Sequence, residues 1–112
     1  MEIELDKLLA KSFDFLIEMI QLSRTLASLD NPIISKSLLQ CSTNINININ
    51  EAIEFNARRS SISKLAKAAE NADETLYWLK RIEKDQLIKA DFPVYISDCQ
   101  YILKHLLAAA HS

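Results

Sequence analysis

The absence of glycine constrains this chain more than any other feature of its sequence. None of the 112 residues is glycine, and Pro32 and Pro93 are the two prolines. Glycine supplies the positive φ angles that tight β-turns and phosphate-cradling loops need, and proline interrupts helices. A chain with so few interruptions favours long helices, and it lacks the residues from which a glycine-rich phosphate loop is built.

The overall composition is that of a folded protein. Hydrophobic residues make up 49% of the chain and charged residues 25%, a balance typical of globular proteins. We expect one domain, residues 1–112, with a packed core. The opening MEIELDKLL is acidic where a secretory signal would be basic, and no apolar run approaches the roughly 18 residues of a membrane span. We therefore expect a cytoplasmic protein without a membrane partner.

Residues 6–29 predict a helix with two neighbouring apolar stripes. The first stripe consists of Leu9, Phe13, Leu16 and Ile20, and the second of Phe15, Met19, Leu22, Leu26 and Leu29. A helix of a lone four-helix bundle usually needs one such stripe, so the surplus indicates contact between subunits. We expect a homo-oligomer whose candidate interface residues are Phe15, Met19, Leu22 and Leu26.

A second helix is expected to begin at Asn31 and Pro32, which suit a helix start. Its apolar stripe is Leu38, Cys41, Ile45, Ile49 and Ala52. Within it, the segment TNINININEA alternates isoleucine with asparagine at the period of a β-strand or an aggregation-prone segment. No other segment alternates, so such a strand would lack a pairing partner and leave its backbone groups unsatisfied. We therefore predict a helix here.

Two further helices follow. Ser60 or Ser61 could cap the third, and Asp91 with Pro93 marks the start of the fourth after a connection at 83–90. The third helix has the stripe Ile62, Leu65, Ala69, Ala72, Leu76, Leu79 and Ile82; the fourth has Phe92, Ile96, Cys99, Leu103, Leu106 and Ala110. The predicted fold is all-α, an antiparallel up-down-up-down four-helix bundle.

Two segments of the chain resemble a known family. The run LLQCSTNINININEA and the later run KLAKAAENADETLYWLKRI are similar to two motifs of the bacterial four-helix-bundle proteins known from intervening sequences in large-subunit (23S) ribosomal RNA genes. The matching residues of the first run are Leu38, Leu39, Thr43, Ile45, Asn48, Ile49, Glu51 and Ala52. Those of the second run are Lys64, Leu65, Glu74, Thr75, Tyr77, Trp78 and Leu79.

This resemblance implies an antiparallel four-helix bundle that tends to assemble into a ring, often of five subunits, and it does not imply an enzyme. Some relatives, such as the accessory protein of diversity-generating retroelements, hold nucleic acid and a reverse transcriptase through a basic surface. The present chain departs from the family pattern at Asn46, where glycine is common, and at Gln40 and Asn50, where a basic residue is common.

Basic residues gather in and near the third helix, although the formal net charge of the chain is -2. The candidates for docking nucleic acid or a nucleic-acid-processing protein are Arg58, Arg59, Lys64, Lys67, Lys80 and Arg81, with Lys84 nearby. Glu70, Asp73, Glu74 and Glu83 oppose them. The alternative interpretation is an ordinary solvated helix face.

Nothing in the sequence indicates a metal, a cofactor or a catalytic site. No Glu-x-x-His pair occurs, and His105 lies seven residues from Asp98, roughly 10 Å along a helix, too far to share one ion. Cys41 and Cys99 lie on apolar stripes without neighbouring basic residues, which favours core packing. We therefore expect a non-enzymatic scaffold or adaptor, with a nucleic-acid accessory protein as the alternative.

The asparagine tract and two aromatic residues leave several interpretations open. Asn44, Asn46, Asn48 and Asn50 suit hydrogen bonding within or between subunits, exposure to solvent, or a ligand site, and Glu51 could extend such a network. Trp78 is expected to anchor the core and Tyr77 to lie at its rim, which we prefer to a base-stacking platform.

Overall fold

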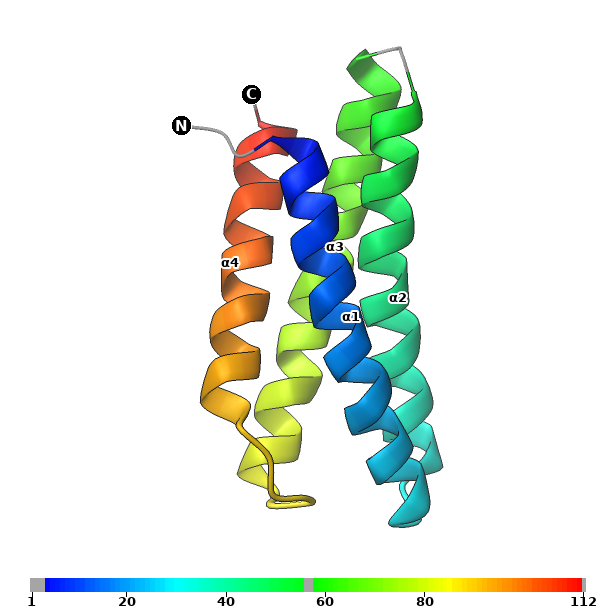
Figure 1. Ribbon diagram of the computed structural model, residues 1–112, viewed down its shortest axis with the longest axis vertical. Helices are drawn as coiled ribbons and strands as arrows, with labels where there is room; N and C mark the ends of the chain where they lie inside the picture. Colours follow the sequence, from blue (N-terminus) through cyan, green and yellow to red (C-terminus); the bar gives the residue numbers. More distant parts are fainter. Residues whose placement is uncertain (1–3, 56–57, 112) are drawn as a thin grey trace.

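Four long helices form the structure, a computed structural model that describes residues 4–55 and 58–111. They are α1 (Leu5–Ser28), α2 (Pro32–Glu54), α3 (Arg58–Lys84) and α4 (Phe92–Ala110), and no strand occurs within the described ranges (Figure 1). The all-α prediction and the four predicted helices are therefore confirmed. None of the described helices combines the length and apolarity that crossing a membrane requires.

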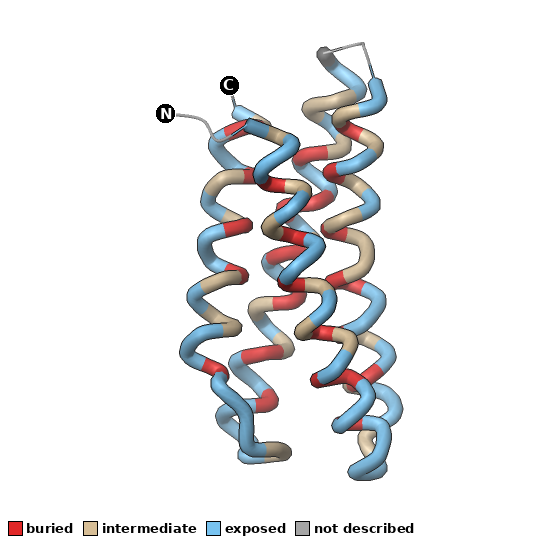
Figure 2. The backbone as a smooth tube through the Cα atoms, in the orientation of Figure 1, coloured by how far each residue is buried: buried red, intermediate tan, exposed pale blue. Residues whose placement is uncertain are grey.

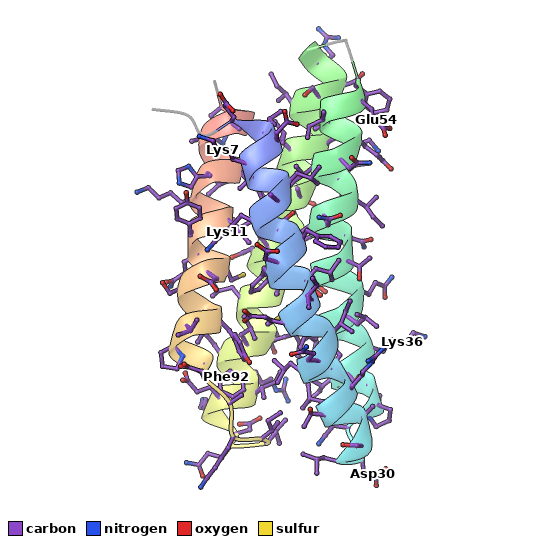
Figure 3. All side chains as sticks on the ribbon, viewed as in Figure 1. Lys7, Lys11, Asp30, Lys36, Glu54 and Phe92 are labelled. Carbon is purple, nitrogen blue, oxygen red and sulfur yellow. The ribbon has the colours of Figure 1, made fainter. Side chains whose placement is uncertain are left out.

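The helices pack as an antiparallel bundle with principal extents of 44 × 23 × 18 Å. α1 packs along α2, α2 along α3 and α3 along α4, whereas α1 and α4 make sparser contact. Lys11 crosses this looser seam: its Nζ lies 3.3 Å from Oδ1 of Asp98 and 5.3 Å from the ring centroid of Tyr101 (Figure 3). The α1–α2 pair and the α3–α4 pair consequently form opposite sides of the bundle.

The isoleucine-asparagine tract is helical, as predicted. Within it, Ile45 and Ile49 are completely buried, while Ile47 is 45% exposed. Because an α-helix has 3.6 residues per turn, residues two positions apart lie on different sides of it. The tract therefore contributes only some of its isoleucines to the core. Buried positions recur along all four helices (Figure 2), and their apolar residues form one core cluster.

The start predicted for the third helix, after a cap at Ser60 or Ser61, is wrong. α3 begins at Arg58, so the residues before Ser60 are already helical. Ser61 does not mark the start, because its hydroxyl donates a hydrogen bond to the carbonyl of Ala52 across the α2–α3 turn, at 3.0 Å. α3 also extends two residues into the connection predicted at 83–90, because it ends at Lys84.

Just after two of the helices, a residue other than glycine adopts the left-handed backbone conformation. Asp30 and Gln86 have φ angles of 67° and 52°. Beyond them, the amide of Asn31 donates to the carbonyl of Leu26, and that of Leu87 to Ile82. These bonds satisfy carbonyls at the ends of α1 and α3, as in a Schellman motif, so the chain closes its turns despite lacking the residue that does so most easily.

Candidate functional site

The four candidate interface residues of α1 lie in the core. Phe15, Met19, Leu22 and Leu26 are all at least 96% buried within this one chain. Their proposed contact with another subunit is therefore corrected: these side chains belong to the hydrophobic core of their own bundle. The apolar stripe of α1 that remains outside the core is therefore the other predicted one, which consists of Leu9, Phe13, Leu16 and Ile20.

Apolar side chains of that other stripe remain exposed beside α2. Phe13 is 53% exposed, Ile17 on the adjoining side 42%, and Leu39 of α2 38%. Half-buried Leu9, Leu16 and Ile20 accompany them. We call these six residues the α1–α2 face. Apolar side chains left exposed in this way favour an interaction site.

Hydrogen bonds fix how α1 and α2 align under this face. Asn46 donates through Nδ2 to the hydroxyl of Ser12, at 3.0 Å, and Ser12 in turn donates to the carbonyl of Leu9. Farther along, the buried Ser35 donates to the carbonyl of Ser23 at 2.6 Å. Because polar groups in a helix interface must find partners, these bonds favour one register of the two helices.

A second apolar feature lies between α3 and α4, on the other side of the bundle. It is an open groove of about 640 Å³, which we call the α3–α4 groove. Its lining residues are Ile62, Ala66, Ala69, Glu70, Asp73, Leu103, Leu107, Ala110 and His111. Small alanines line part of the groove, and two carboxylates stand at its rim.

The basic docking candidates do not form one patch. Lys64 and Lys67 lie toward the start of α3 and Lys80 and Arg81 toward its end, along a helix of 27 residues, about 40 Å. Exposed Glu70, Asp73 and Glu74 separate the two groups. The exposed Arg59 belongs to the first group, and the side chain of Arg58 lies outside what the structure describes.

The second basic group surrounds an aromatic residue. Tyr77, Lys80, Arg81, Lys84 and Asp85 line a surface pocket of about 480 Å³. Arg81 donates from Nη1 to the hydroxyl of Tyr77 at 3.1 Å, and its Nε lies 3.6 Å from Oδ2 of Asp85. The hydrogen bond to Tyr77 is the main reason that the pKa of Arg81 is raised. These contacts hold the charged guanidinium of Arg81 at the solvent-exposed surface of the protein.

Trp78 and Tyr77 lie ring against ring near the end of α3. Trp78 is half-buried against the core, and its ring meets that of Tyr77 edge-on, with centroids 5.1 Å apart. Trp78 also lines a smaller pocket of about 330 Å³ with Arg81 and residues of the α1–α2 turn. Tyr77 is 53% exposed at the rim.

Two of the remaining asparagines and Glu51 of the family motif face α3. Asn44, Asn48 and Glu51 line a polar groove of about 400 Å³ together with Asn71 and Lys67 of α3. Nζ of Lys64 forms an ion pair with Oε2 of Glu51 across this groove, at 2.6 Å. Asn50 instead donates to Glu54 on the solvent side, at 3.3 Å. The asparagines of the tract thus divide between the contact with α1, the contact with α3 and solvent. Thr43, another residue of the family motif, donates a hydrogen bond to the carbonyl of Leu39.

Both cysteines are buried free thiols in the core. Burial raises the pKa of Cys41 to about 11 and that of Cys99 to about 12. Thr75, whose hydroxyl oxygen lies 3.1 Å from Sγ of Cys41, is a fully buried polar residue that the stripe analysis missed, although the family motif contains it. Thiols with raised pKa values are poor nucleophiles.

No metal cluster is found in the described part of the chain. Within residues 4–55 and 58–111, no group of three or more histidine, cysteine, aspartate or glutamate side chains could hold a metal ion. His105, which the sequence aligned with Asp98, lies against the ring of Tyr101 instead, with centroids 4.3 Å apart.

Comparison with known proteins places the whole bundle in context. The family model for the 23S rRNA-intervening sequence protein matches residues 6–108. A crystal structure of a protein with unknown function from the S23 ribosomal protein family of Bacteroides thetaiotaomicron VPI-5482 superposes with a TM-score of 0.91. It is 27% identical in sequence, and the match covers 98% of this chain and 100% of that one. No curated protein matches.

Proposed function

Because this chain belongs to the 23S rRNA-intervening sequence protein family, we propose that it is a non-enzymatic, homo-oligomeric bundle acting as a scaffold or adaptor. The observation that carries the proposal is the exposed α1–α2 face. Phe13, Ile17 and Leu39 leave apolar surface in water after the core of the bundle is complete. Covering that surface with a second copy would remove it from water, which is the dominant favourable term in most protein association.

The chemistry of the described residues supports a binding role better than a catalytic one. The buried thiols have pKa values raised to about 11 and 12, and the strongest surface features are apolar faces and isolated charged groups. General acid-base or nucleophilic catalysis would need a titratable group poised near the operating pH beside a substrate pocket. Binding surfaces on a rigid bundle need only complementary shape and charge.

Light scattering coupled to size-exclusion chromatography tests the proposal. The natural chain is expected to elute as a defined multiple of 12.8 kDa, and the family resemblance implies five copies. The double variant Phe13→Asp, Ile17→Asp is expected to run as a 12.8 kDa monomer, because two carboxylates would be desolvated in the contact.

A matched control distinguishes a lost contact from a lost fold. Tyr77→Asp with Val94→Asp changes two similarly exposed residues away from the α1–α2 face and is expected to keep the natural mass. Circular dichroism should report the same helix content for all three proteins. A natural chain that stays monomeric at every concentration would contradict the proposal.

The basic pocket at the end of α3 favours a second candidate function, a nucleic-acid accessory role. Lys80, Arg81 and Lys84 offer three cations beside the exposed ring of Tyr77, a combination that suits phosphates next to an unstacked base. The acidic residues in the middle of α3 would confine such binding to this end of the bundle.

Fluorescence anisotropy with a labelled single-stranded RNA tests this second candidate. Binding is expected to weaken as salt rises, and Lys80→Glu with Arg81→Glu should reduce the slope of log affinity against log salt by about 2, about one for each phosphate contact. The control Lys7→Glu with Lys104→Glu makes the same charge change elsewhere. Affinity that ignores salt, or that survives the first double change, would rule out this candidate.

A further inference from the structure

We propose that the polar groove between α2 and α3, which we call the α2–α3 groove, binds an extended peptide segment of a partner protein through hydrogen bonds to its main chain. The groove has a volume of about 400 Å³ and is lined by polar side chains of both helices. Peptide binding here goes beyond the proposed homo-oligomer, because it assigns a partner to a surface that the proposed contact between copies does not use.

Two asparagines of the groove have amide groups available for a partner. Asn44 and Asn48 are half-buried, and within the described ranges neither side chain has a hydrogen-bond partner. The other two asparagines of the tract differ, since Asn46 bonds to α1 and Asn50 to a glutamate of α2. Asparagine forms helices less readily than alanine, because its side chain competes for backbone hydrogen bonds. At positions 44 and 48 no bond within the described bundle compensates for this cost, which favours a partner outside it.

The ion pair between Lys64 and Glu51 sets the level at which residues of the two helices face each other across the groove. α2 and α3 run antiparallel (Figure 1) and rise equally per residue, so equal steps away from this pair reach the same level on both helices. The groove residues that face each other in this register are Asn48 with Lys67, and Asn44 with Asn71. The groove therefore has two facing rows of hydrogen-bonding side chains, one on each helix.

The spacing within each row matches the repeat of an extended peptide. Asn44 and Asn48 on α2, like Lys67 and Asn71 on α3, are four residues apart, which is about 6 Å along a helix. An extended chain rises about 3.3 Å per residue and turns the N–H and C=O groups of every second residue to the same edge, about 6.6 Å apart. A peptide lying along the groove would therefore present one residue to each side chain of a row, with alternate residues facing α2 and α3.

The chemistry of the lining also suits a peptide main chain. An asparagine amide both donates and accepts, so one side chain can pair with the C=O and the N–H of the same peptide residue. Lys64 and Lys67 are balanced by Glu51 and Glu70, so the groove lacks the excess positive charge that phosphates require. Ile47, which is 45% exposed beside the asparagines, offers an apolar contact to a peptide side chain.

Peptide selection followed by binding measurements tests this assignment. A phage library of random short peptides is selected on the purified natural chain, and the most enriched peptide is synthesised with a fluorescent label as the probe. By fluorescence anisotropy, Asn44→Ala and Asn48→Ala are each expected to weaken its binding about tenfold, because each change removes about two hydrogen bonds. Asn50→Ala, the same change on the solvent side of the same helix, is the matched control and should leave the affinity unchanged. Alanine favours the helix, so circular dichroism should show all three variants folded.

Methylating the amide nitrogens of the probe one at a time separates main-chain recognition from side-chain recognition. Binding is expected to be lost at positions two residues apart, because these N–H groups point to the same row of the groove. A library that yields no binding peptide, or a peptide that tolerates both asparagine changes or methylation at every position, would overturn the inference. None of these outcomes bears on the homo-oligomer, which is decided separately by the mass of the natural chain.

Discussion

Replacing Ile49 with alanine is expected to destabilise the protein by about 2–5 kcal/mol, whereas the same change at Ile47 is expected to cost less than about 1 kcal/mol. Ile49 is completely buried, so alanine would remove apolar contacts and leave a cavity in a close-packed core. Ile47 is nearly half exposed and loses little on truncation. At about 4–8 °C per kcal/mol for a domain near this size, the Ile49 variant should melt at least about 8 °C lower.

This pair of substitutions also tests the helix directly, because the two isoleucines are only two residues apart. In a β-strand, residues separated by two share one face, so Ile47 and Ile49 would have similar burial and similar cost. In the helix of the structure they differ. Urea unfolding followed by circular dichroism measures both values, with Ile45→Ala, also fully buried, as the positive control. Equal losses at Ile47 and Ile49 would speak against the helical tract.

Alkylation of the two thiols is expected to be about 100-fold slower at Cys41 and about 1000-fold slower at Cys99 in the folded protein than in the urea-unfolded chain. Burial raises the pKa values from 9.0 to about 11 and about 12, which lowers the thiolate fraction at pH 8 by those factors. Restricted access to buried sulfur adds to the effect. At Cys99, the thiol also donates a hydrogen bond to the carbonyl of Ala72, at 3.2 Å. This bond further stabilises the protonated form of the thiol.

The pH dependence gives the same prediction a second measurement. The alkylation rate of the unfolded chain should begin to level off at about pH 9, where half of its thiols are ionised, and reach its plateau about one pH unit higher. In the folded protein the thiolate fraction should continue to rise about tenfold per pH unit toward pH 11. Mass spectrometry after timed iodoacetamide quenching assigns each cysteine. Rapid labelling of both residues in the folded protein at pH 8 would show that the core opens far more easily than the packing indicates.

The sequence by itself determined the fold class and most of the helix boundaries. The stripe Leu38, Cys41, Ile45, Ile49 and Ala52 is buried at every position, and α2 and α4 begin where their prolines indicated. These predictions succeeded because a helix repeats every 3.6 residues and buries one side, so the spacing of apolar residues encodes which side is inward. Local signals were weaker where serine could serve either as a cap or as a partner for another helix, as at Ser61.

The tertiary structure alone decided which apolar stripe of α1 is left over, and where the candidate surfaces lie. Phe15 and Phe13 belong to stripes of similar apolarity, and only the neighbouring helices determine that Phe15 is buried and Phe13 is not. The α3–α4 groove likewise combines residues about forty positions apart, such as Ala66 and Leu107. Periodicity describes each helix in isolation, whereas a surface depends on how helices are rotated and paired, and that is settled by packing between distant segments.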